Sequence, residues 1–326
     1  MTALPRALCP RGLTWAVLTT HRAAARTWAV FVLALAVGLV ALYYLGEYTE
    51  RVTLPCGGAG SPVCGSGHDD RAIAAISRYT SWSGVASSLL AYMPLGVAAW
   101  AGGALVAREV EQDTTALSWT QTTTPTRWLV AKLALPTLAL ALGSVLLTVL
   151  FRWTWVSGDP HVRADWYMDD VYRATGPVGP ASALFALLLG VVIGLWVRRT
   201  LPALGLGFVG MGIVQLLGAR HRADLWPKEF WSGKNHSLAW SHVEPFALEG
   251  VVTPSGERIG MEACRVSSGG VNIQRCMEKT GATEVYGFLH PTSHYWPLQW
   301  VETGILLAAA GLLTFLAFRL LRRRLP

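Results

Sequence analysis

Six long stretches of this chain contain no Asp, Glu, Lys or Arg, and they constrain its fold more than any other feature. A helix needs about 20 mainly apolar residues to cross the roughly 30 Å of hydrocarbon in a bilayer. Five stretches reach or approach that length. The sixth is shorter, but it continues on its N-terminal side through PLQWVE, where Glu302 is the one charge. The stretches are residues 27–46, 79–107, 133–151, 174–197, 200–219 and 303–318.

The composition agrees with this pattern. Charged residues make up 14% of the chain, whereas soluble domains contain about one quarter. Because lipid offers no partner for free backbone N–H and C=O groups, each stretch is expected to be a helix. We therefore predict an all-α membrane protein of the cell membrane, with six transmembrane helices and a small outer unit between helices five and six. The net charge of +7 does not indicate nucleic acid, because no such binding motif is present.

The distribution of Lys and Arg predicts the orientation, because short cytoplasmic loops carry an excess of both. If both termini are cytoplasmic, the inside segments hold 13 basic and 3 acidic residues in 61 positions, and the outside loops hold 14 and 17. This bias predicts the N-in/C-in arrangement. The expected parts are a cytoplasmic or interfacial N-terminal helix (1–26), helices one to five (27–219), an outer unit (220–297), and helix six with a basic tail (298–326).

The predicted outer unit has few recognisable features of its own. The sequence TPSGER, residues 253–258, predicts a turn between short extended segments around Val251 and Ile259. An alternative function for the whole chain depends on this unit, namely a membrane receptor or scaffold whose outer unit binds a ligand.

Four of the five cysteines fall in predicted outer loops as two close pairs, Cys56 with Cys64 and Cys264 with Cys276. That side of a membrane is oxidising, so both pairs are predicted to be disulfides. The alternative is a metal site, because seven of the eight His residues also lie outside. His290 and His294 are four residues apart, but the proline between them argues against a regular helix that would present both as ligands. We therefore expect disulfides and no metal.

One glycine pattern matches a nucleotide-binding motif in the wrong context. Residues 205–210 read G-x-G-x-x-G, but a dinucleotide fingerprint follows a strand and precedes an acidic residue by about 20 positions. Here the pattern lies inside an uncharged stretch, so Gly205, Gly207, Gly210 and Gly212 are predicted to permit close helix contact. No G-x-x-x-x-G-K-[ST] sequence occurs, so the chain has no P-loop of its own.

A short charged segment separates helices two and three. Arg108, Glu109, Glu111 and Asp113 lie within six residues, and the predicted orientation places them in the cytoplasm. As a helix, the segment has apolar residues on more than one side, which indicates contacts on two sides. The residues alone favour a solvated loop that stabilises the ends of the neighbouring helices.

Two motifs, however, make the chain resemble the permease subunit of ABC-2 type transporters, especially the actinobacterial branch. The first is RExExxT at residues 108–114, followed by LxWTQ at 117–121, Arg127-Trp128 and Lys132. The second is PxSHYWxxQxxE at residues 291–302, which is similar to the outer entry of the last helix in that family. The motifs are short, but the six-helix pattern covers the whole chain.

The resemblance implies that residues 107–121 are a coupling helix on which a separate ABC ATPase subunit docks. ATP and Mg would bind that subunit, and this chain would carry neither a cofactor nor a catalytic site. Two copies of the chain, or one copy and a similar permease, would form a homodimer or heterodimer in membrane lipid and export a substrate. The residues assigned to coupling are Arg108, Glu109, Glu111, Asp113, Thr114, Leu117, Trp119 and Gln121.

Polar residues within the apolar helices are candidates to line a substrate pathway, although bonding between helices is their commoner use. The sequence contains neither GxSxG nor HExxH, and the uncharged stretches hold no Asp, Lys or His, so a membrane enzyme is not expected. The pathway candidates are Ser87, Ser88, Tyr92, Gln215, Gln299 and Glu302.

Glu302 is the most unusual of these candidates, because it would lie near the outer edge of the hydrocarbon. A carboxylate at that depth is costly unless it is paired or wetted. Arg152 and Arg220, each at the outer end of a predicted helix, are its candidate partners. The alternative is a carboxylate at a helix end that reaches water among the lipid headgroups.

Overall fold

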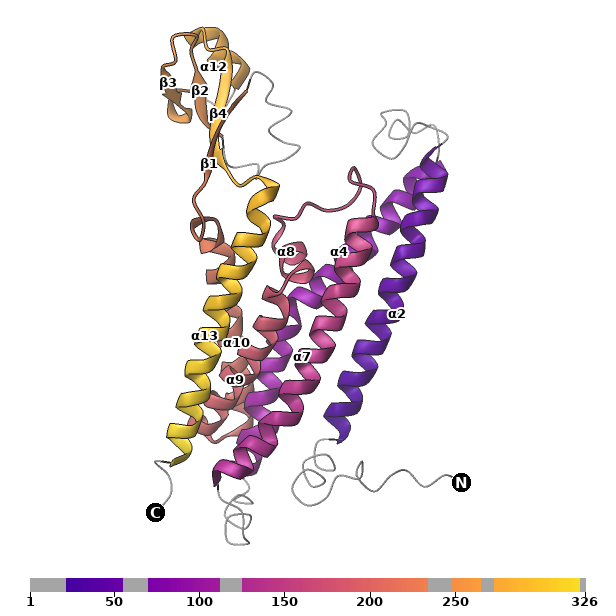
Figure 1. Cartoon of the computed structure of the whole chain (residues 1–326), viewed down its shortest axis with the longest axis vertical. Coiled ribbons are helices and arrows are strands. Elements are labelled where there is room, and N and C mark those ends of the chain that lie inside the picture. The colour runs from indigo at the N-terminus through magenta and orange to yellow at the C-terminus, as the bar shows by residue number, and fades with distance from the viewer. Residues whose placement is uncertain (1–21, 55–69, 112–124, 234–247, 265–272, 323–326) are drawn as a thin grey trace. The chain divides into compact units, whose positions relative to one another are not determined.

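Figure 1 shows the computed structural model of the chain, which describes residues 22–54, 70–111, 125–233, 248–264 and 273–322. The described residues form two compact units. The helical unit contains those up to residue 217 and from residue 303 onward, and the sheet unit contains those from 218 to 302.

Among the described residues, six helices are long and apolar enough to cross a membrane. They follow the uncharged stretches of the sequence and confirm an all-α membrane fold with a small sheet after the fifth helix. Several extend beyond the uncharged stretch at a charged end; the first, for example, runs on through Glu47 and Arg51, which form an i,i+4 ion pair. The helices are α2 (Arg22–Thr53), α4 (Asp70–Trp100), α7 (Pro125–Ser157), α9 (Val178–Val197), α10 (Thr200–His221) and α13 (Tyr295–Arg322).

Two of the spans differ in detail from the predicted stretches. The second continues beyond α4 as a π-helix, η3 (Ala101–Ala107), and then as the short helix α5 (Arg108–Glu111). The fourth stretch is divided, because α8 (Asp169–Thr175) ends at an extended Gly176 and α9 begins only after Pro177. Proline is favoured at such a start, where its missing N–H leaves no helical hydrogen bond unmade.

Two clusters of buried apolar side chains fill the helical unit. One joins α4, η3, α7, α9, α10 and the C-terminal part of α13, and the other joins α2, α4, α7 and α8. Large apolar side chains also cover the exposed faces, such as Leu33 on α2 and Leu201 on α10. Helices that are apolar on all sides are expected where the surroundings are lipid.

The helix backbones approach closely where α9 and α10 meet the second span. A Cβ added to Gly194 would lie 2.6 Å from the carbonyl oxygen of Gly102, and one added to Gly207 would lie 2.6 Å from that of Ala98. The predicted packing role of glycine is therefore confirmed at Gly207, whereas Gly205 faces open space. The whole G-x-G-x-x-G pattern lies inside α10, as its context predicted.

The described part of the sheet unit contains four antiparallel strands in the order β1-β4-β2-β3. The predicted turn at residues 253–258 is confirmed as the connection between β2 and β3. Its reversal uses Gly256, whose φ of 84° is accessible to glycine at little cost. The strands are β1 (Glu229–Gly233), β2 (Leu248–Val252), β3 (Arg258–Gly260) and β4 (Glu284–Leu289).

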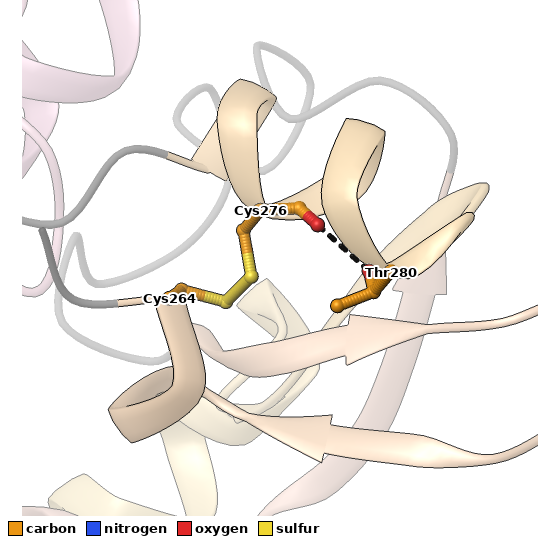
Figure 2. Close-up of a disulfide and its surroundings, with 3 residues drawn as sticks. All are labelled: Cys264, Cys276 and Thr280. Carbon is orange, nitrogen blue, oxygen red and sulfur yellow. Dashed lines mark hydrogen bonds between the residues drawn. A yellow bond between two sulfur atoms is a disulfide. The ribbon is translucent and has the colours of Figure 1, made fainter.

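A disulfide joins Cys264, at the end of η5 (Met261–Cys264), to Cys276 in α12 (Ile273–Thr280), as Figure 2 shows. The same view shows Thr280, whose hydroxyl donates to the Cys276 carbonyl oxygen at 2.7 Å. Both cysteines belong to the small apolar cluster of this unit. This predicted disulfide is confirmed, whereas Cys56 and Cys64 lie outside the described residues.

Candidate functional site

The predicted coupling segment begins in the described part of the chain and continues beyond it. Arg108, Glu109 and Glu111 belong to α5, which follows η3 without a break, and Arg108 is exposed. The other predicted coupling residues lie outside the described residues; these are Asp113, Thr114, Leu117, Trp119 and Gln121.

Glu111 ties α5 to the first residue of α10. One of its carboxylate oxygens, Oε2, accepts a hydrogen bond from the Thr200 backbone N–H at 2.9 Å and another from the Thr200 hydroxyl at 2.5 Å. These two bonds lower the pKa of Glu111 from its ordinary value, and the bond from the Thr200 hydroxyl has the larger effect. The charge of nearby Arg199 acts in the same direction. A carboxylate at a helix N-terminus also meets free N–H groups and the positive end of the helix dipole.

The connection between α9 and α10 holds Thr200 in this position. It consists of Arg198 and Arg199, and Arg198 adopts a left-handed conformation, with φ of 60°, as the C-cap of α9. Thr200 is the first residue of α10, and only two residues separate it from α9. A displacement of α5 that moves Thr200 would therefore also move the start of α10.

Lys132 ties a third helix to the same end of the bundle. Its ammonium group lies in α7 and donates to the carbonyl oxygen of Leu105, in η3, at 3.2 Å. Both residues are buried. A π-helix is rare and often marks a functional position, because its hydrogen-bond pattern departs from that of the α-helix. We call this region, from η3 through α5 with Lys132 and Thr200, the α5 end.

A cavity of about 1200 Å³ lies among α2, α4 and α7 in the helical unit. Its walls are mainly apolar, and Asp170, in the first turn of α8, is the one charged residue among the described residues that line it. Several small residues of α4 and α7 leave the space open, including Gly84 and Gly96. Its polar lining residues include Ser81, Ser88, Tyr92 and Asp170.

Two serines of α4 hold the Asp170 carboxylate. Its Oδ2 atom accepts a hydrogen bond from the Ser87 hydroxyl at 2.5 Å and a longer one from the Ser88 hydroxyl at 3.4 Å. Among the described residues, no cationic side chain forms an ion pair with Asp170. The carboxylate therefore enters an apolar cavity with hydroxyl groups as its hydrogen-bond donors.

The nearest arginine in the sequence, Arg173, is engaged elsewhere. It is buried and forms an ion pair with Asp169 at 2.9 Å, and it donates to the Gln215 carbonyl oxygen at 2.6 Å. The Gln215 side chain in turn donates to the carbonyl oxygen of Ala91 at 2.8 Å. This network links α8, α10 and α4 and does not involve the cavity.

The structure separates the predicted pathway residues into different roles. Ser88 and Tyr92 line the cavity, and Ser87 binds the carboxylate that enters it. Gln215 bonds to the backbone of a neighbouring helix, which is the commoner alternative. Gln299 is fully buried.

Glu302 is paired, but its partner was not predicted. Arg222, in the 3₁₀ turn η4 (Arg222–Asp224), donates from Nε to the Glu302 carboxylate at 2.9 Å. The candidates Arg152 and Arg220 were wrong, because α10 ends at His221 and the tighter turn that follows brings Arg222 to the carboxylate. Arg152 instead donates to the Thr175 carbonyl oxygen at 3.4 Å.

The two histidines four residues apart do meet, although they do not share a regular helix. His290 follows β4 and His294 lies in the turn η6 (Thr292–His294), with their Nδ1 atoms 3.1 Å apart. His294 also contacts Glu229 at 3.0 Å, and His290 contacts the Ala223 carbonyl oxygen at 2.9 Å. Within the described ranges, no group of three His, Cys, Asp or Glu side chains has the arrangement of a metal site.

Sequence reasoning missed Asp170, the charged residue of the cavity. It lies in a segment predicted as an outer loop, and its serine partners precede it by 83 and 82 residues. The one local signal was the pair Asp169-Asp170 just before an uncharged stretch. The cavity is also lined by Trp28, Phe31 and Trp100. No sequence pattern distinguishes these three residues from the other aromatic residues of the apolar helices.

The chain matches the model of a known protein family. The family described as "ABC-2 membrane transporter related" matches residues 23–221, which include α2 to α10 and so contain the cavity and the α5 end. No match was found among curated proteins or among solved structures.

Proposed function

Because the chain belongs to the ABC-2 membrane transporter related family, we propose that it is the permease subunit of an ATP-driven exporter whose ATPase is a separate chain. The family and the six apolar helices make it a multi-pass membrane transporter permease. In the proposal, the α5 end faces the cytoplasm of a cell whose plasma membrane holds the protein, and the substrate moves outward.

One observation carries the coupling step: the hydrogen bonds of Glu111 to Thr200. They connect the segment on which the ATPase would dock to the start of a membrane helix. Thr200 is itself the first residue of α10, so no loop separates the contact from that helix. Residues 107–121 would dock the ATPase, so a displacement of this segment would reach α10 through Thr200.

Two further contacts support the same route into the bundle. Arg108 continues η3 of the second span, so α5 and the end of α4 move together. The Lys132 bond to Leu105 joins α7 to η3. ATP-driven approach of two ATPase subunits would thus move α4, α7 and α10 together and change access to the cavity, which is a shift between two discrete states.

ATP and Mg bind the ATPase subunit in this proposal, and the permease contributes no catalytic group. Two permeases, identical or similar, form the complete membrane part. We also propose that residues 112–121, the second part of the coupling segment, contact the ATPase subunit.

The test uses the full chain co-purified with its ABC ATPase and reconstituted in proteoliposomes. A Gly96→Cys substitution supplies a probe, because a Cβ there meets no atom within 4 Å and the residue lines the cavity. Labelling of this cysteine by a thiol reagent is compared with and without ATP and vanadate. The chain without the substitution gives the background from native cysteines.

In the parent protein, ATP and vanadate should change the labelling rate. Glu111→Ala and Thr200→Val should reduce that change while ATP hydrolysis persists, and Thr200→Ser should retain it. Thr80→Val is the matched control, because the Thr80 hydroxyl is exposed and bonds to its own helix. The proposal fails if no ABC ATPase associates, or if Glu111→Ala leaves the ATP-dependent change intact.

A further inference from the structure

The cavity has the size and the walls of a site for an apolar molecule. Its volume of about 1200 Å³ slightly exceeds the roughly 300–1,000 Å³ of small-molecule pockets. Aromatic rings of α2 and α4 contribute to the walls. Trp28 and Phe31 stack with ring centroids 5.7 Å apart, and Tyr92 and Trp100 lie among the same lining residues.

The one charged side chain among the described lining residues is a carboxylate. It belongs to Asp170, and its hydroxyl partners supply hydrogen bonds but no positive charge. Arg173 is occupied by Asp169 and by the Gln215 carbonyl oxygen. An ionised carboxylate in an apolar site is stabilised most by a cation that enters with it.

The aromatic rings favour the same kind of ligand. A cation near the face of Trp, Tyr or Phe is attracted by the ring quadrupole, and the attraction grows when the site excludes water. A molecule that combines an apolar body with one positive charge would fill the volume and meet both Asp170 and these rings.

We infer that the cavity binds a lipophilic cation and that Asp170 selects the charge. This inference rests on the proposed transport function, for which the bound cation would be a substrate or a substrate-like ligand. Ser87 and Ser88 position the carboxylate, and Trp28, Phe31, Tyr92 and Trp100 contact the apolar body.

The test measures equilibrium binding of radiolabelled tetraphenylphosphonium to the full chain in phosphatidylcholine nanodiscs. Tetraphenylborate has the same shape and the opposite charge, and empty nanodiscs give the partition into lipid. We expect saturable binding of the cation and none of the anion above the lipid background. Asp170→Asn, which removes the charge and keeps the shape, should weaken binding by at least about tenfold.

Two controls separate charge, space and folding. Asp165→Asn removes an exposed carboxylate from the same segment and should leave binding unchanged. Gly84→Leu should weaken binding without altering any charge, because a Cβ there meets no atom within 4 Å and the side chain would occupy the cavity. Gly38→Leu is its counterpart on α2, also in open space but not among the lining residues.

The inference is overturned if Asp170→Asn and the parent bind the cation equally, if tetraphenylborate binds as well, or if neither probe binds. It is also overturned if phosphatidylethanolamine in the nanodisc abolishes cation binding, since a lipid amine would then be the occupant. None of these results bears on ATPase association or on the Glu111 experiment. A failure of the inferred ligand is therefore distinguishable from a failure of the proposed function.

Discussion

One polar contact of the α5 end and one ion pair of the sheet unit differ in their exposure to water. At the α5 end, an exposed Glu111 accepts two hydrogen bonds from a single residue, Thr200. In the sheet unit, the side chains of Arg222 and Glu302 are 10% and 11% exposed and form an ion pair, and a disulfide joins Cys264 to Cys276 in the same unit.

The difference determines which contacts can be exchanged. Water can replace an exposed hydrogen bond at small cost. Breaking a buried ion pair leaves an uncompensated charge and is strongly unfavourable. The contact between Glu111 and Thr200 is therefore suited to exchange, whereas the pair of Arg222 and Glu302 is suited to stay intact.

The largest expected effect tests the buried side of this comparison. Arg222→Met should lower the free energy of unfolding by about 3–5 kcal/mol, because Glu302 would remain buried without its cation. Thermal unfolding of the full chain in detergent, followed by circular dichroism, measures the loss.

Two further variants sharpen this result. Arg222→Met combined with Glu302→Leu should recover much of the stability, because neither charge is then left unpaired. Arg51→Met removes an exposed i,i+4 pair with Glu47 and should cost no more than about 0.5 kcal/mol. A single variant as stable as the parent would show that water reaches Glu302.

Removal of the disulfide should have the next largest effect. Cys264→Ser with Cys276→Ser opens a link between residues 12 apart in sequence, and closing a loop of this size contributes about 3 kcal/mol. Limited proteolysis should show faster cleavage within residues 218–302. Thr280→Val removes only the hydrogen bond to the Cys276 carbonyl and should leave cleavage nearly unchanged. Equal cleavage of the parent and the double variant would show that the disulfide does not stabilise the sheet unit.

Local sequence patterns predicted most of the helices. An uncharged stretch of about membrane length depends on neighbouring residues alone, and each of the six stretches contributes to one of the six long apolar helices of the described chain. The turn at residues 253–258 was predictable for the same reason, because proline and glycine restrict or free the backbone at their own positions. The disulfide between Cys264 and Cys276 followed from their proximity in sequence and a predicted oxidising side.

Contacts between distant residues were not predictable from such patterns. Asp170 meets Ser87 only because α8 folds back against α4, which no periodicity encodes. Glu302 pairs with Arg222 and not with Arg220 because α10 ends before Arg222 and a 3₁₀ turn begins there. Glu111 was assigned to coupling with an ATPase subunit, and its bonds to Thr200 arise from the packing of α5 against the turn before α10.

A pair of glycines in α10 offers a smaller test of how rigidly the helices are held beside the α5 end. Gly207→Ala should destabilise the chain by about 1–3 kcal/mol, because its Cβ would lie 2.6 Å from the Ala98 carbonyl oxygen. Gly205→Ala, two residues away, faces open space and should be neutral or slightly stabilising. Thermal unfolding of the two variants side by side checks this. Equal losses would show that the helices adjust freely.

The smallest expected effect concerns the exposed contact itself. Because bonds from Thr200 lower the pKa of Glu111 below its ordinary value of 4.5, the contact is complete above that pH and is lost as the pH falls through the lowered value. Hydrogen exchange of the Thr200 amide, corrected for the intrinsic rate, should accelerate in that acidic range. In Glu111→Ala it should be fast at every pH, whereas the buried amides of α9 should keep their protection. Persistent protection of Thr200 in Glu111→Ala would mean that another group caps α10, and the α5 end would then lack the exchangeable contact that distinguishes it from the sheet unit.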